Sequence, residues 1–140
     1  MRVITVFLAL AMPMAACAAT STRVELSGAP VTVEAERVKA DAKGRLVLHL
    51  DDVRLSKGAG ANVRIYLNAP KATAETGTEH PGFVQSLILV PSSTTRTPQG
   101  QNFAFPLPPS ARAADPIVIT FVPLGRKSVT MKRPYVTVTE

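Results

Sequence analysis

The chain has 140 residues, of which 46% are apolar and 19% charged, and this composition is enough for one domain with a real core. The net charge is +6, but acidic residues interrupt the basic ones along most of the chain. A dense basic patch with interleaved aromatic residues is missing, which argues against nucleic-acid binding and for an ordinary soluble surface. Twelve prolines and eight glycines favour many short segments joined by turns.

The first segment, residues 1–17, has the pattern of a secretory signal. A single early arginine precedes an apolar run from Val3 to Met14, and small residues follow this run. The run is short for a membrane span, and Thr5 and Pro13 interrupt it, which argues against a permanent transmembrane anchor. We therefore expect the protein to be exported to the periplasm.

The only cysteine, Cys17, lies where the apolar run gives way to small residues. Residues 14–17, with the sequence MAAC, resemble a bacterial lipoprotein box, although leucine is more usual than methionine at the first position. If the box is used, Cys17 carries the lipid that holds the mature protein on a membrane. The alternative is ordinary cleavage after Ala18, which discards the cysteine. Neither outcome leaves a disulfide within the mature chain.

Residues 18–29 are expected to form a short linker, and residues 30–140 a single β-sandwich domain. From about residue 23 onward, apolar and polar residues alternate with period two. This alternation is typical of strands that bury one face. The segment 31–38 is a clear example, because valines and alanine occupy every second position before its end.

The segment 45–55 predicts a long strand with an irregularity. Its leucines lie on one face: Leu46, Leu48 and Leu50. The adjacent Asp51 and Asp52 then break the register, which predicts a β-bulge or tight turn. Neighbouring side chains on a strand point to opposite faces, so these two carboxylates are not expected to share acid–base chemistry.

The segment 62–70 predicts a strand that runs straight into a turn. One face carries Val63, Ile65 and Leu67, and Tyr66 is among the residues on the other face. The following segment 71–77 is short and polar and ends at glycine. It predicts one helical turn at most.

The remaining strands differ in their apolar patterns. The segment 83–91 is apolar on both faces after Gln85, which predicts a central strand covered on both sides. Prolines end the short strand 101–107, so we expect it at a sheet edge. The segment 116–124 is β-branched and apolar on both faces, and 133–140 closes the chain with alternating residues.

No segment repeats apolar residues at i, i+3, i+4 and i+7 over three helical turns. Seven to eight strands separated by turn signals therefore predict an all-β fold, an antiparallel β-sandwich or barrel.

Residues that could support catalysis are few. The two histidines are His49 and His80, whereas a catalytic zinc or copper site needs three or more ligands. We expect His49 to be a partly exposed strand residue, and His80 to form a weak metal site at most. Serines lack the G-x-S-x-G context of a nucleophile elbow. The sequence therefore predicts a protein without catalytic activity and without a cofactor.

Four segments, in their order along the chain, resemble the C-terminal β-domain of tyrosinases and plant-type polyphenol oxidases: residues 63–68, 82–87, 118–123 and 129–138. The first, VRIYLN, is similar to the family pattern V-R-(I/V)-(Y/F)-(L/I)-N. The second, GFVQSL, is similar to (E/G)-(F/Y)-(V/A)-G-S-(F/L), with Gln85 in place of the family's glycine. The resemblance spans about residues 45–140 and does not include the helical dicopper domain.

The resemblance implies a role for this domain beside a copper enzyme. In the family, the β-domain packs over the entrance of the dicopper site and places a bulky side chain into it. A free-standing exported copy would be a partner or an active-site shield for a type-3 copper oxidase. The loop from Lys71 to Phe83 would then reach the partner, with His80 and Phe83 as candidate contact or shield residues.

Two alternatives stay open at this point. Phe83 could simply be the first core residue of its strand. The protein could also be a structural or interaction lipoprotein of the bacterial cell envelope with no link to copper.

Overall fold

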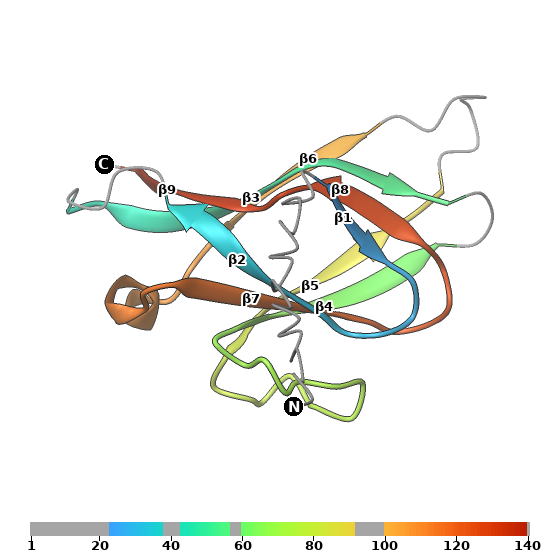
Figure 1. Cartoon of the computed structure of the whole chain (residues 1–140), viewed down its shortest axis with the longest axis horizontal. Coiled ribbons are helices and arrows are strands. Elements are labelled where there is room, and N and C mark those ends of the chain that lie inside the picture. Colours follow the sequence, from blue (N-terminus) through green and yellow to red (C-terminus); the bar gives the residue numbers. More distant parts are fainter. Residues whose placement is uncertain (1–22, 38–42, 57–59, 92–99, 140) are drawn as a thin grey trace, which may run out of the picture.

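The computed structural model describes residues 23–37, 43–56, 60–91 and 100–139. They form nine strands and one short 3-10 helix (Figure 1): β1 (Arg23–Leu26), β2 (Val31–Arg37), β3 (Arg45–Leu55), β4 (Ala61–Leu67), β5 (Phe83–Leu89), β6 (Gln101–Pro106), η1 (Pro109–Ala113), β7 (Ile117–Pro123), β8 (Val129–Lys132) and β9 (Tyr135–Thr139). The all-β fold predicted from the sequence is confirmed.

The strands are joined by hydrogen bonds in the order β1-β8-β3-β9-β2-β7-β4-β5, and β6 pairs with β3 outside this path. Figure 1 shows that the sheet folds back on itself, so that β3, β6, β8 and β9 lie over β2, β7, β4 and β5. Among the described strands every pair is antiparallel except β2 with β9, which are parallel over two residues. This pair links the two layers.

The N-terminal strand β1 begins earlier than we expected. Residues 23–26 lie inside the segment 18–29 that the sequence analysis assigned to a linker, yet they pair with β8. Val24 and Leu26 are buried, because the alternation that starts at residue 23 turns both side chains toward the core. The domain therefore includes part of the expected linker.

The core lies between the two layers and follows the predicted alternation. On β3 the buried residues are Leu46, Leu48 and Leu50, and on β4 they include Val63, Ile65 and Leu67. The strand β7 lies between β2 and β4 and buries residues on both faces, as its sequence predicts. Burial of a side chain of this size stabilises the fold by about 1.5–3 kcal/mol.

The strand β5 was expected to be central, and this prediction is wrong. It ends the strand order and, within the described residues, pairs only with β4. Leu87 and Leu89 are buried, whereas Ile88 is 68% exposed and Val90, just beyond the strand, is 70% exposed. Both faces of this segment are therefore apolar, but only one of them packs in the core and the other is exposed. The predicted edge position of β6 is consistent with its pairing, among the described strands, to β3 alone.

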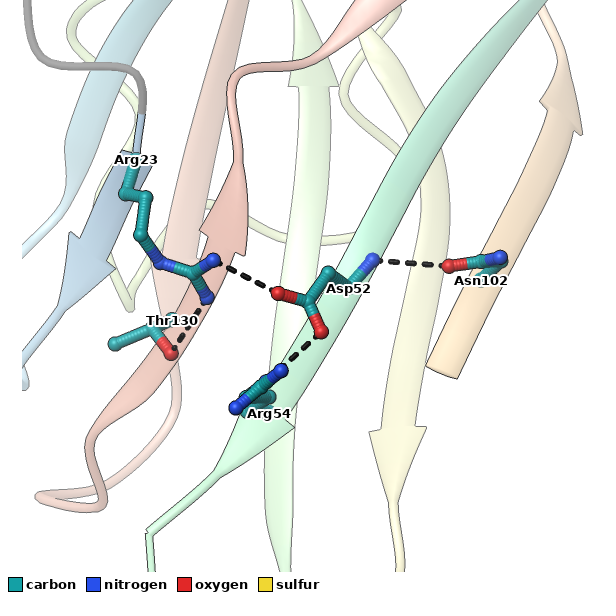
Figure 2. Close-up of polar contacts among 5 residues, drawn as sticks. All are labelled: Arg23, Asp52, Arg54, Asn102 and Thr130. Carbon is teal, nitrogen blue, oxygen red and sulfur yellow. Dashed lines mark hydrogen bonds and ion pairs between the residues drawn. The ribbon is translucent and has the colours of Figure 1, made fainter. Parts of the chain in front are cut away.

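A bulge interrupts β3 at the adjacent aspartates, as the sequence predicts. The register with β6 shifts between Leu50 and Val53, and Asp52 has a φ of 52°. Figure 2 shows that the Asp52 carboxylate accepts hydrogen bonds from Arg23 Nη1 and Arg54 Nε, each at 2.8 Å. The Asp52 backbone N–H donates to Asn102 Oδ1 at 2.9 Å. This cluster links β1, β3 and β6.

We expect Asp52 to stabilise the fold in a pH-dependent way. Hydrogen bonds from Arg23 and then Arg54 hold the pKa of the Asp52 carboxyl below its ordinary value of 3.8. A carboxyl whose pKa is lowered by folding adds stability above its unfolded pKa, and this stability is lost as the pH falls through the folded pKa. Asp52→Asn should therefore lower the Tm at neutral pH, and the difference from the wild type should vanish in strong acid. Thermal unfolding across the pH range measures it.

The matched control for this prediction is Glu34→Gln, which changes an exposed carboxylate on β2 outside the cluster. Its Tm should stay close to that of the wild type at every pH. A constant Tm difference for Asp52→Asn from neutral to acid pH would contradict the role of the charge.

Among the described residues, no helix is long and apolar enough to cross a membrane. The signal segment 1–17 and the lipidation site Cys17 lie outside the described residues. Both remain predictions.

Candidate interaction site

The loop that joins β4 to β5, residues 68–82, covers the outer face of the sheet near Tyr66. Figure 1 shows it, in green, extending beyond the ends of β4, β5 and β7. A second hydrophobic cluster forms beneath it and is called here the rim cluster: Tyr66, Ala69, Ala72 and Val122, with half-buried Phe83 and Leu124. Ala69 and Ala72 of the loop are buried in this cluster.

Tyr66 anchors the loop through its hydroxyl group. Its side chain points away from the main core, as the alternation predicts, but it is fully buried because the loop lies over it. The hydroxyl donates a hydrogen bond to the Thr76 carbonyl oxygen at 2.6 Å. Arg64 Nη1 donates to the same carbonyl oxygen at 2.9 Å. Two side chains of β4 therefore hold the middle of the loop.

The two ends of the loop are held together by backbone hydrogen bonds. Leu67 N donates to Gly82 O at 2.7 Å, and Phe83 N donates to His80 O at 2.8 Å. A Cβ atom at position 82 would lie 2.5 Å from Leu67 O, so this close approach requires glycine. Asn68 continues the pairing of β4, because its backbone N–H donates to Val118 O and its Oδ1 accepts from Val118 N.

The two candidate contact residues, His80 and Phe83, meet at Tyr66. Their ring centroids lie 5.8 Å and 5.7 Å from that of Tyr66, both in edge-on arrangements. His80 is exposed, and Phe83 is half-buried. Edge-on aromatic pairs stabilise by about 0.5–1.5 kcal/mol beyond their burial. The structure therefore brings these residues together at one rim of the domain. Part of the Phe83 ring packs against the rim cluster, and part of it is exposed to solvent.

The nitrogen atoms of His80 have unequal roles. Nδ1 accepts a hydrogen bond from the Gly82 backbone N–H at 3.0 Å, so in the neutral ring the proton lies on Nε2. A metal ion at Nδ1 would have to break the hydrogen bond from Gly82, and a metal ion at Nε2 would have to replace its proton. No group of three or more His, Cys, Asp or Glu side chains in the described part of the chain could hold a metal ion.

His49 lies on β3 as a half-buried residue, as predicted. Its ring stacks on Tyr135 at 4.8 Å, and its Nε2 lies 2.7 Å from Thr137 Oγ1. Burial, and then a hydrogen bond with Asp51, raise the pKa of Tyr135. Asp51 and Asp52 thus contact different partners, which agrees with the prediction that their carboxylates point apart.

We expect the purified protein to bind no copper pair and to oxidise no phenols. The reason is the ligand supply, since the chain has two histidines and each already has a hydrogen-bond partner, Thr137 on β9 for His49 and the Gly82 backbone N–H for His80. Metal analysis after copper loading, together with a catechol oxidation assay, measures this. Two coppers per chain with catechol oxidation would contradict the prediction, whereas one weakly held copper at His80 would not.

No known protein-family profile matches the chain, and no curated protein matches its sequence. Solved structures do match its fold. The structure of latent apple tyrosinase matches with a TM-score of 0.64 and 17% identity, over 81% of this chain and 26% of that chain. Recombinantly expressed latent aurone synthase, a polyphenol oxidase, matches with a TM-score of 0.63 and 15% identity, over 84% of this chain and 25% of that chain.

Latent aurone synthase from its natural source matches in the same way, with a TM-score of 0.60 and 14% identity, over 81% of this chain and 26% of that chain. The chain therefore spans about a quarter of the length of the oxidases that it matches. At these identities the likeness shows the fold alone. The resemblance predicted from residues 45–140 is confirmed at this level: the chain has a tyrosinase-like β-domain fold.

Proposed function

We propose that the protein is a non-catalytic, exported β-domain that binds a type-3 copper oxidase and shields its active site. The observation that supports this is the fold shared with about a quarter of latent apple tyrosinase and latent aurone synthase. Both matched structures are of latent enzymes. A separate chain with the same fold can cover the active site of an oxidase from outside, as a β-domain within the same chain would.

The surface that we assign to the partner combines the rim and the exposed face of β5. Phe83 begins this strand, and Ile88 and Val90 follow with 68% and 70% exposure. The strand from Phe83 to Leu89 carries no charged residue. Solvent-exposed edge strands usually carry charges that prevent pairing with other chains, and neighbouring exposed apolar residues mark interaction sites. An uncharged, apolar edge beside an aromatic rim is suited to a protein partner.

The test is a binding measurement between the full-length protein and a type-3 copper oxidase from the same organism that lacks its own β-domain. Isothermal titration calorimetry should show one chain per oxidase. The double variant Ile88→Lys/Val90→Lys should weaken binding by at least about tenfold, or about 1.4 kcal/mol. Ala104→Lys, an equivalent change at an exposed position on β6, should leave the affinity unchanged. Absence of binding by the wild type would overturn the proposal.

The second candidate function is a structural or interaction lipoprotein of the cell envelope without a link to copper. The supporting observation is the lipoprotein-like box at residues 14–17. Mass spectrometry of the mature N-terminus should find a lipid on Cys17 as the first residue. A mature chain that starts at Ala19 without lipid would contradict the membrane anchor.

A further inference from the structure

A cleft of about 900 Å³ lies at the end of the sandwich where β3 and β5 begin. Its walls come from three parts of the chain: residues 43–46 before and at the start of β3, residues 81–84 at the start of β5, and residues 106–109 at the end of β6. Arg112 of η1 and Thr139 of β9 complete it. Its volume falls within the range of about 300–1,000 Å³ that is usual for small-molecule sites.

The described charged residues that line the cleft all have the same sign. Among the described residues of the lining they are Lys43, Arg45 and Arg112, and none of the described lining residues is a carboxylate. Arg112 Nη2 donates a hydrogen bond to the Lys43 carbonyl oxygen at 2.8 Å, which holds the guanidinium group beside the backbone that leads into β3. Within the described residues, no ion pair joins any of the three to an acid. Clefts lined by one sign of charge concentrate ions of the opposite sign.

The base of the cleft is apolar and fixed in position. Leu46 and Leu107 are buried, and the Leu107 backbone N–H donates to Leu46 O at 2.8 Å, which ties the end of β6 to β3. Phe83 lines the same cleft as a half-buried ring. Prolines contribute rigid walls, because their backbone φ is restricted. An apolar group can therefore be buried here with little loss of side-chain freedom in the protein.

We propose that this cleft binds a small organic anion that has an apolar body and a single carboxylate or sulfonate group. Arg45 and Arg112 supply the charge for the anionic group, and the base formed by Leu46, Leu107 and Phe83 supplies the apolar contact. The proposal does not require an oxidase partner, since every group that it uses belongs to this chain, and it shares only Phe83 with the surface that we assign to such a partner.

Two fluorescent probes with nearly the same aromatic framework test it: anilinonaphthalene sulfonate, which carries the anionic group, and phenylnaphthylamine, which does not. Fluorescence titration of the full-length protein should show saturable binding of one sulfonate probe per chain. The uncharged probe should bind at least about tenfold more weakly. Equal affinities for the two probes would overturn the proposal.

Substitutions locate the site. Arg45→Gln and Arg112→Gln should each weaken binding of the sulfonate probe by about tenfold and leave binding of the uncharged probe unchanged. Lys132→Gln, an exposed change on β8 outside the cleft, should have no effect. Ile88→Lys/Val90→Lys should also retain full binding, because the exposed face of β5 is not part of the cleft. Loss of binding in that double variant, or normal binding in both arginine variants, would show that the probe binds elsewhere. A thermal scan of each variant confirms that it is folded.

Discussion

Replacement of Tyr66 by alanine is expected to lower the free energy of unfolding by about 3–5 kcal/mol, the usual range for a buried aromatic residue. Tyr66 is among the largest fully buried side chains of the described residues, and it belongs to the rim cluster. Its loss removes the apolar contact with Ala69 and Ala72 and the hydroxyl bond to Thr76 O. Urea unfolding measures the change.

The same variant should release the loop from the sheet. Hydrogen exchange should accelerate at the Leu67 and Phe83 amides, whose hydrogen bonds to Gly82 O and His80 O close the loop, because the contacts that hold the loop in place are lost. The matched control is Tyr66→Phe, which removes the hydroxyl alone. Arg64 still donates to the Thr76 carbonyl oxygen, so this variant should lose only about 0.5–1.5 kcal/mol. Equal losses for the two variants would contradict the packing role of the ring.

The second large effect is a difference in the free energy of unfolding that is lost when Phe121 and Phe83 are each replaced by alanine. Phe121 on β7 is fully buried in the main core, and Phe121→Ala should cost about 3–5 kcal/mol. Phe83 is half-buried and packs against the rim cluster, so Phe83→Ala should cost clearly less, about 1–2 kcal/mol on the same scale. Urea unfolding of both full-length variants measures the difference. Phe121→Leu provides a milder variant if the alanine form does not fold.

The outcome decides what Phe83 can do for a partner. A residue that is only partly committed to packing retains exposed surface that a second protein can cover. If Phe83→Ala destabilises the domain as much as Phe121→Ala does, Phe83 is a core residue and its assignment as a contact or shield residue is wrong.

The local alternation of apolar and polar residues correctly predicted those strands that turn one face to the core and the other to solvent. Leu46, Leu48 and Leu50 illustrate this, because their period of two needs no knowledge of neighbouring strands. The bulge at Asp51 and Asp52 was also visible, since two adjacent acids cannot both continue the alternation. Tyr66 and Phe83 lie beside the loop because they belong to the strands at its two ends.

Features that depend on distant parts of the chain were not visible in the sequence. The apolar pattern of Ile88 and Val90 is the same for a covered strand and for an exposed edge, and only the strand order distinguishes the two. Tyr66 was assigned to the outer face without any sign that the loop would cover it. The parallel pairing of β2 with β9 joins residues about a hundred positions apart, and no local signal specifies it. The cationic cleft likewise gathers Lys43, Arg45 and Arg112 from separate segments.

The central claim is that this chain shields the active site of a type-3 copper oxidase. The most direct measurement is the rate of catechol oxidation by an oxidase that lacks its own β-domain, with increasing amounts of the full-length protein. We predict that the rate falls to a low plateau as the complex forms, and that Ile88→Lys/Val90→Lys requires at least about tenfold more protein for the same effect. An unchanged rate at a protein concentration that saturates binding would contradict the claim.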